Sequence, residues 1–213
     1  MKKLFLLLIP GTLWAQQKED QNVVQGSDLL MSRKASANLK VDGSPYIQKD
    51  YETGTTTNST KMYQIRYDAF ADEMEFKQDG TILIANKIIG QKFKLDNKTY
   101  TTIRYTNDKN DQTVGYLVEL IANPGGYSLY KKELVTKIDA IQGLNSYQAS
   151  KNSYYERQKD QFIISYDNKF YYVPSNARKF EGELKNLTDE YQKKNRLKLD
   201  EKGLIDFVNF INK

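Results

Sequence analysis

A short acidic run is the first candidate for chemistry in this chain. Asp72, Glu73 and Glu75 stand close together, and alternation along a strand would place Glu73 and Glu75 on one face, with Met74 and Phe76 opposite. Two carboxylates roughly 5–10 Å apart can serve as the acid and base of glycoside hydrolysis. The same alternation is typical of a solvated strand face. The pattern therefore leaves open both a hydrolytic or cation-binding site and a plain surface.

A second acidic pattern imitates a calcium loop. The spacing of the calcium ligands at positions 1, 3, 5 and 12 is met by Asp108, Asn110, Gln112 and Glu119. The glycine that such a loop needs for its sharp turn is replaced by Thr113. The flanking residues predict strands rather than helices, and Glu119 fits a strand position. We therefore expect no calcium site here.

A third pattern imitates the nucleophile of penicillin-binding enzymes. Ser128 and Lys131 have the Ser-x-x-Lys spacing, which works at the start of a helix where the two side chains share a face. Here the pattern follows a turn and lies in a predicted strand. The companion motifs of that family are absent from the sequence. Chance is the better explanation.

Missing residue types narrow the chemistry further. The sequence contains no His and no Cys, so the usual zinc, copper and haem ligands are lacking, as are the commonest general base and the Cys nucleophile. We expect no metal and no cofactor, and a non-enzymatic role is favoured. The net charge of +5 is spread among interleaved acidic and basic residues, so we expect no nucleic-acid partner. The most basic stretch, 193–198, fits the solvated side of a helical region.

Tyrosine is the most distinctive component, with 16 in the chain. Many fall in predicted strands, where Tyr is common. Tyr147, Tyr154 and Tyr155 instead fall in the polar stretch 142–160, which we predict to be a loop. Exposed aromatic side chains in loops often carry contacts. These three tyrosines are the predicted binding residues, and Asp72, Glu73 and Glu75 are the alternative site.

The elements that would position these residues are mostly strands. Alternating or apolar runs predict strands at 62–69, 73–76, 81–85, 93–95, 100–105, 114–122, 127–138, 162–166 and 170–173. The stretches 53–60 and 106–112 read as loops, and Asn123-Pro124-Gly125-Gly126 reads as a tight turn. Apolar residues then recur at helical spacing, in one stripe over 180–191 and another over 204–211.

These elements predict an α+β fold, a mainly antiparallel sheet curled into a sandwich or partial barrel with a C-terminal helical pair docked on it. The expected divisions are a signal peptide at 1–15, a flexible leader at 16–43, a β-rich domain at 44–175 and a helical segment at 176–213. The basic start, the apolar run 4–9, Pro10-Gly11 and Ala15 are typical of a cleavable secretory signal. The run is too short to span a bilayer. We therefore expect an exported chain without a membrane-spanning segment, located in the periplasm or at the cell surface.

Two motifs resemble those of an uncharacterised family of exported Bacteroidota proteins. The first is Ser44-Pro45-Tyr46, and the second is the stretch from Arg66 to Phe76, Arg-Tyr-Asp-Ala-Phe-Ala-Asp-Glu-Met-Glu-Phe. The charged C-terminal helices, with the stretch 200–205, and the Asn- and aromatic-rich tail look similar too, so the resemblance extends from about residue 44 to the end. This sequence departs from the pattern at Asp68, where Asn is more usual. The resemblance implies an envelope location and a β-rich fold, and it supplies no catalytic residues.

Together these observations favour a non-enzymatic envelope protein that binds another envelope component, either a protein or a glycan. The alternative is a carboxylate-based hydrolase that acts on glycan or cell-wall material through Asp72, Glu73 and Glu75.

Overall fold

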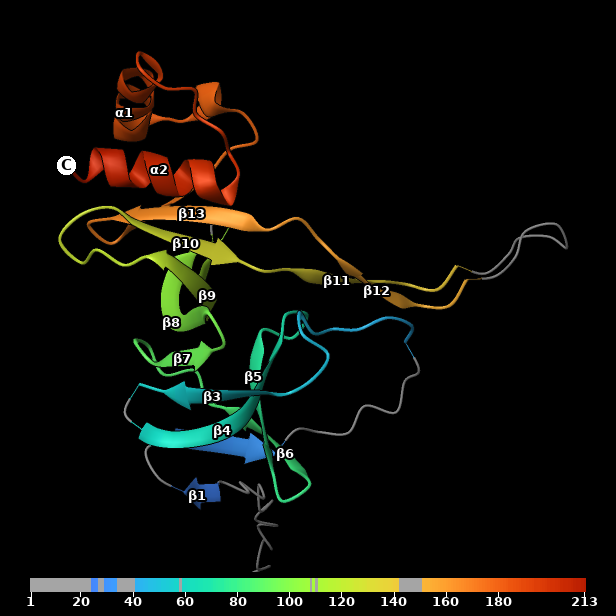
Figure 1. Ribbon diagram of the computed structural model, residues 1–213. Helices are drawn as coiled ribbons and strands as arrows, with labels where there is room; N and C mark the ends of the chain where they lie inside the picture. The colour runs from blue at the N-terminus through green and yellow to red at the C-terminus, as the bar shows by residue number, and fades with distance from the viewer. Residues whose placement is uncertain are drawn as a thin grey trace, which may run out of the picture.

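The computed structural model describes residues 24–26, 29–33, 41–57, 59–107, 109, 111–141 and 151–213. Within this part of the chain, 12 strands form one sheet, and Figure 1 shows it curling beneath the C-terminal helices. Every pair of neighbouring strands in it is antiparallel. The predicted α+β class with a mainly antiparallel sheet is confirmed.

Most neighbouring strands in the sheet are consecutive in the chain, but four of them cross the sheet in reverse order. From one edge to the other they are β1 (Val24–Gly26), β2 (Leu29–Arg33), β6 (Thr81–Ala85), β5 (Glu73–Gln78), β4 (Ser59–Asp68), β3 (Glu52–Thr56), β7 (Lys92–Leu95), β8 (Lys98–Thr106), β9 (Gln112–Ile121), β10 (Ser128–Lys132), β13 (Gln161–Tyr166) and β14 (Lys169–Tyr172). The sheet is open, because β1 and β14 form its two edges.

Alternation along the strands builds the first hydrophobic core inside the curled part of the sheet. Ile65 and Tyr67 of β4 face this core together with Met74 and Phe76 of β5, and all four are buried. Phe93 of β7 packs edge-on against Phe76. The period of two in the sequence therefore identifies the inner face of these strands correctly.

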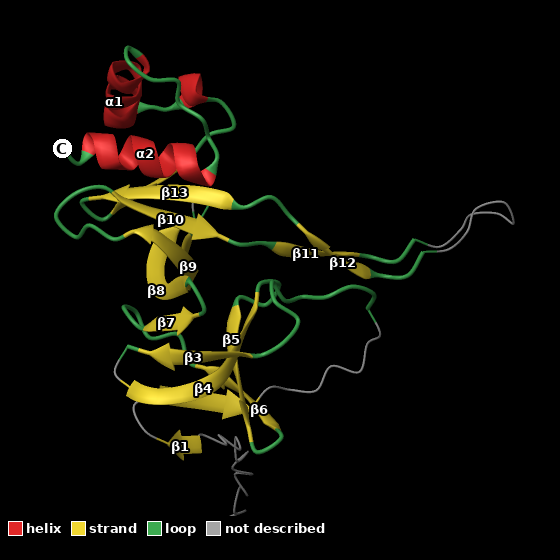
Figure 2. Ribbon diagram, in the orientation of Figure 1, coloured by secondary structure: helices red, strands yellow, loops and turns green. Residues whose placement is uncertain are grey.

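The second core lies between the C-terminal helices and one face of β9, β10 and β13 (Figure 2). A short 3₁₀ turn, η1 (Ala177–Lys179), precedes α1 (Gly182–Gln192) and α2 (Glu201–Ile211). The predicted stripe of α2 is buried, with Leu204, Phe207 and Val208 inaccessible to solvent. Asp200 begins this helix by accepting a hydrogen bond from the Gly203 amide at 2.8 Å, which satisfies one free helix N–H. The predicted helical pair is confirmed.

Between β10 and β13 the chain leaves the sheet as a projecting hairpin, residues 133–141 and 151–160, which we call the arm (Figure 1). Its strands β11 (Val135–Ile138) and β12 (Tyr154–Arg157) pair with each other, and β12 is also bridged to Asp42 of the body. The prediction of one strand over 127–138 is wrong, because β10 ends at Lys132 and β11 turns away into the arm. The prediction of a loop over 142–160 is also wrong at 154–157, where polar residues pair in register with β11.

Two other stretches differ from expectation. Residues 53–60 were expected to form a loop, yet β3 and the start of β4 occupy most of them. The expected flexible leader contains β1 and β2, and Met31 of β2 pairs with Ala85 of β6 and is buried in the first core. These strands are short or polar, so their periodicity is too weak to predict them. Pairing with neighbouring strands forms them. Among the described residues, no helix has both the length and the apolar character needed to cross a membrane.

Candidate functional site

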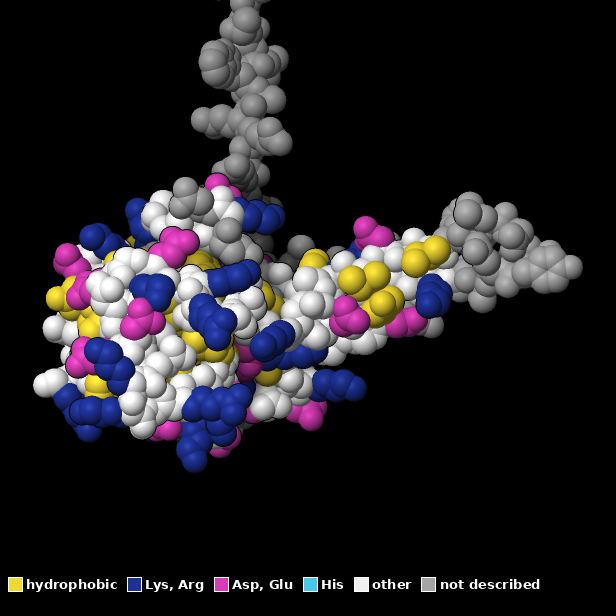
Figure 3. Space-filling view, turned by 90° about the horizontal axis from the view of Figure 1, so that it is seen from above, with side chains coloured by type: hydrophobic (Ala, Val, Ile, Leu, Met, Phe, Trp, Pro, Cys, Tyr) yellow, Lys and Arg dark blue, Asp and Glu magenta, His cyan; other side chains and the backbone are white. Residues whose placement is uncertain are grey.

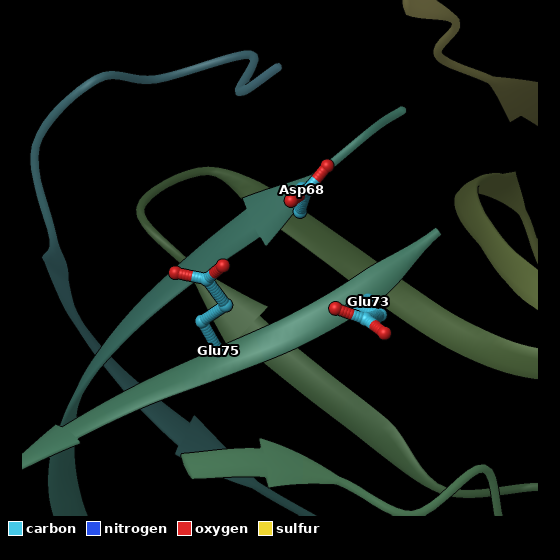
Figure 4. A group of neighbouring side chains, drawn as sticks. All are labelled: Asp68, Glu73 and Glu75. Atoms are coloured by element: carbon cyan, nitrogen blue, oxygen red, sulfur yellow. The ribbon is translucent and has the colours of Figure 1, made fainter. Parts of the chain in front are cut away.

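The predicted acidic residues occupy the turn between β4 and β5 and the start of β5. Asp68 ends β4, and its Oδ1 accepts hydrogen bonds from the amides of Phe70 and Ala71 at 3.1 and 2.9 Å. This bonding stabilises the turn, and Asp72 completes it in the left-handed region at a φ of 56°, which Asp tolerates better than most residues. Oxygen atoms of Asp68, Glu73 and Glu75 all lie within 4.8 Å of one another (Figure 4). The structure thus brings Glu73 and Glu75 together with Asp68.

Glu75 is at the centre of this cluster and is 0% exposed. Its Oε2 accepts hydrogen bonds from the Arg66 guanidinium at 2.8 Å and from the Tyr51 hydroxyl at 3.0 Å. Its Oε1 accepts a hydrogen bond from the Tyr46 hydroxyl at 3.2 Å. The guanidinium carbon lies 3.4 and 4.2 Å from the ring centroids of Tyr46 and Tyr51, which places the cation between two aromatic faces. We call Tyr46, Tyr51, Arg66 and Glu75 the tyrosine clamp.

The interpretation of this strand face as solvated is wrong, because another segment covers it. The carbonyl of Pro45 accepts hydrogen bonds from the backbone amides of Ala69 and Phe70. The carbonyl of Lys49 accepts a hydrogen bond from Arg66 Nη1 at 2.8 Å. The segment 44–51 thereby lies across β4 and β5. It also brings the two motifs of the family resemblance, Ser-Pro-Tyr and the stretch 66–76, into direct contact.

Burial has a measurable effect on the clamp. The pKa of the Tyr51 phenol is raised to about 12, first because the group is desolvated and second because the Glu75 carboxylate lies beside it. Tyr51 therefore stays protonated and donates to Glu75 throughout the neutral range. Sequence reasoning missed Tyr46, Tyr51 and Arg66, since the segment 44–51 has no periodicity to mark it.

Carboxylate oxygens at this spacing are the ligands that Ca²⁺ and Mg²⁺ prefer. In this cluster, however, Glu75 already makes a charge-assisted bond to Arg66, and a second cation would face the guanidinium at short range. One carboxylate oxygen of Asp68 already accepts the hydrogen bonds of the turn amides. The arrangement fits an anchor for the segment 44–51 better than a metal centre or a pair of free catalytic carboxylates.

Asp72 belongs to a different network that joins the turn to β10. Lys132 Nζ donates to Asp72 Oδ1 at 2.5 Å and to the Tyr67 hydroxyl at 3.1 Å. Lys87 Nζ donates to the other carboxylate oxygen at 2.7 Å. Asp72 approaches so closely that a Cβ on Gly115 would stand 2.5 Å from its Oδ2. A side chain at position 115 would therefore displace the Asp72 carboxylate.

Lys132 is the most chemically unusual group in this network. Burial lowers the pKa of its ammonium group, and the Asp72 carboxylate opposes that shift. Burial also raises the pKa of the Tyr67 phenol well above its usual range, with Asp72 adding to the effect. The carboxylate, the ammonium group and the phenol form a closed bonding network. Such a network favours a structural link between β4 and β10.

The other two sequence patterns serve structural purposes where they can be seen. Glu119 forms an ion pair with Lys92 at 2.8 Å, and Asp108 and Asn110 lie outside the described residues. Ser128 exchanges hydrogen bonds with the backbone of Asn123, whereas Lys131 pairs with Glu201 of α2. Ser128 and Lys131 are three positions apart on a strand and so point to opposite faces, which rules out a shared nucleophile site.

The predicted tyrosines have different positions. Tyr147 lies outside the described residues. Tyr154 and Tyr155 lie on β12 and so point to opposite sides of the arm. Tyr155 packs edge-on against Phe70 of the body, with the ring centroids 5.1 Å apart. Tyr154 is 36% exposed, and Ile141, at the end of the described part of the arm, is 60% exposed.

The root of the arm is fixed by a buried carboxylate. Glu133 accepts hydrogen bonds from the Tyr100 hydroxyl at 2.6 Å and from Lys98 Nζ at 2.8 Å, both on β8. Beside it, Arg157 Nη1 donates to the carbonyl of Leu134. The parallel bridge between Asp42 and Tyr154 adds a further tie to the body. The direction in which the arm leaves the sheet is therefore set by bonds at its root.

Comparison of the chain with models of protein families, with curated proteins and with solved structures finds no significant match. The resemblance to the exported Bacteroidota family stays a prediction. Function must be argued from the geometry of the chain itself.

Proposed function

We propose that this chain is an exported, non-enzymatic binding module that contacts another protein of the cell envelope through its arm. The observation that carries the proposal is the exposure of Tyr154 and Ile141 on a hairpin that projects from the body (Figure 3). Figure 3 shows hydrophobic side chains along the arm beside acidic and basic ones.

The construction of the arm supports recognition. A two-stranded hairpin is marginally stable in water, so a hairpin of this kind gains little by extending away from its own core. Its root is nevertheless fixed by Glu133 and by the contact between Phe70 and Tyr155. A hairpin whose direction is fixed, with exposed aromatic and aliphatic side chains, provides anchors that protein partners bind. Asp42 is bridged to β12, whereas within the described residues β11 is an edge strand to which a partner strand could add.

The remaining features fit a binding role better than catalysis. Glu75, the central carboxylate of the alternative hydrolase, is fully buried and bonded to Arg66 and two tyrosines. A glycosidase acid must reach the glycosidic oxygen of its substrate. Export is supported by the signal-like pattern of residues 1–15.

Photocrosslinking tests the arm in cells. A photoreactive amino acid at Tyr154 or Ile141 is expected to give one discrete crosslinked species in the envelope fraction, whereas the same group at Met62 is not. Met62 is a matched control, since it is 58% exposed but lies on β4 of the body. Equal crosslinking from all three positions would contradict recognition by the arm.

N-terminal sequencing of the same material is expected to begin at Gln16, and a chain retained in the cytosol with residues 1–15 intact would contradict export.

A further inference from the structure

The sheet face opposite the C-terminal helices carries a groove that the arm does not use. Neighbouring residues on β10 and β13 point to opposite sides: Leu129 and Ile164 pack under the helices, whereas Tyr130 and Ile163 belong to a separate small core. Figure 1 shows α2 lying over β10 and β13 on the first of these faces. The second face holds a groove of about 680 Å³, within the usual range for small-molecule sites.

Half-buried flat side chains line part of this groove. The strand register brings Phe170 of β14 beside Ser165 of β13, on the same face as Tyr130. Tyr130, Phe170 and Ile103 all line the groove and stay half-buried, because no layer of the described structure covers them. A ligand with apolar flat faces would complete the burial of these rings.

The polar lining is almost free of charge. Hydroxyl and amide groups come from Ser165, Asn123, Gln112 and Asn168, and the charged side chains are one cation and one anion, Arg104 and Asp167. The lining therefore has no net charge, although the chain as a whole carries +5. Electrostatic complementarity thus favours a neutral ligand over a nucleic acid or an acidic polymer.

Two threonines that line the groove, Thr101 and Thr102, have a buried hydroxyl without a hydrogen bond within the described structure. Thr101 of β8 is 5% exposed. Alternation places Thr101 on the same face of β8 as Ile103. Buried hydroxyls are rarely left unbonded in native structures. A ligand that carries hydroxyl groups would satisfy the hydroxyl of Thr101.

We propose that this groove binds a neutral oligosaccharide. Pyranose rings combine apolar C–H faces with equatorial hydroxyls, so they match rings such as Tyr130 and Phe170 set among hydroxyl and amide groups. The sugar faces stack on these two rings, and a sugar hydroxyl bonds to Thr101. The site is separate from the arm, so either site can be present without the other.

Calorimetric titration of the purified chain tests this site. The probes are neutral tetrasaccharides of glucose, mannose and N-acetylglucosamine, with tetragalacturonate as the acidic comparison. We expect at least one neutral tetrasaccharide to bind with a Kd in the millimolar range or tighter, and tetragalacturonate to bind at least ten times more weakly. Binding by no neutral probe, or preferential binding of tetragalacturonate, would overturn the proposal.

Three variants locate the binding. Tyr130→Ala is expected to weaken binding at least tenfold, and Thr101→Val, which keeps the shape of the side chain, at least threefold. Met62→Ala is the control, since Met62 is exposed on β4 and does not line the groove, and it should leave the Kd unchanged. If circular dichroism shows that Tyr130→Ala does not fold, the Kd values of Thr101→Val and Phe170→Leu are used in its place to test the site. Unchanged affinity in these groove variants would place the sugar elsewhere and overturn the assignment.

Discussion

Replacing Glu75 with Gln should remove much of the stability that the tyrosine clamp provides. Glu75 is fully buried and accepts hydrogen bonds from Arg66, Tyr51 and Tyr46 at 2.8, 3.0 and 3.2 Å. Gln keeps the shape but leaves the guanidinium without its bonded counter-charge. Removing one partner of a buried ion pair costs about 3–5 kcal/mol. Because Asp68 and Glu73 keep negative charge within 4.8 Å of position 75, we expect the lower end, about 3 kcal/mol.

Urea denaturation followed by circular dichroism measures this loss. With a slope of about 1–3 kcal/mol per molar urea, the midpoint should fall by roughly 1–3 M. Glu119→Gln is the control, because its partner Lys92 has an exposed side chain and such a pair contributes only about 0–1 kcal/mol. Hydrogen exchange adds a local measurement: the amides of Ala69 and Phe70, which bond to Pro45, should exchange faster in Glu75→Gln.

A double variant separates charge burial from packing. Arg66→Met combined with Glu75→Leu removes both charges, so it should be less destabilised than Glu75→Gln alone. The reasoning is refuted if Glu75→Gln loses less than about 1 kcal/mol, or if the amides of Ala69 and Phe70 keep their protection.

Two further predictions use the same urea assay. The folded-state pKa of Tyr51, about 12, lies above the 10.0 of a free tyrosine, so its contribution to stability is fully present below pH 10 and is lost as the pH rises toward 12. The stability difference between the wild type and Tyr51→Phe should therefore shrink from pH 9 to pH 11, and a constant difference would argue against the shift. Gly115→Ala places a Cβ 2.5 Å from Asp72 Oδ2 and should cost about 1–3 kcal/mol by displacing Asp72 from Lys132. Gly125→Ala, whose Cβ meets no atom within 4 Å, should change stability by less than about 0.5 kcal/mol, and equal effects at the two glycines would contradict the close approach of Asp72.

Strong periodicity made most of the fold predictable. The inward positions of β4 and β5 follow from alternation, and the buried stripe of α2 follows from helical spacing. The strands 162–166 and 170–173 also follow from local pattern, and Asp167 and Asn168 between them adopt the left-handed conformation that a tight hairpin turn needs. These elements depend on local pattern, which a single sequence carries in full.

The candidate sites depend on contacts that have no local pattern. Alternation assigns Glu75 to a face of β5, but it does not reveal that the segment 44–51 covers that face. Asp72 and Lys132 are 60 positions apart, so the local sequence around either residue does not predict the hydrogen bond between them. Tyr154 and Tyr155 were predicted to lie in a loop, but they form a strand by pairing with β11, and no local periodicity marks that pairing.

The position of the arm in the chain bears on how the protein could diversify. β10 and β13 are neighbours in the sheet, with Lys132 opposite Gln161, so the whole arm is an excursion between two strands that already pair. Lengthening a loop between fixed ends costs only about 0.6 kcal/mol of closure entropy for each doubling. Insertions and deletions beyond the root can therefore accumulate without disturbing either core. Related chains could exchange partner specificity by remodelling this one excursion while inheriting the same scaffold.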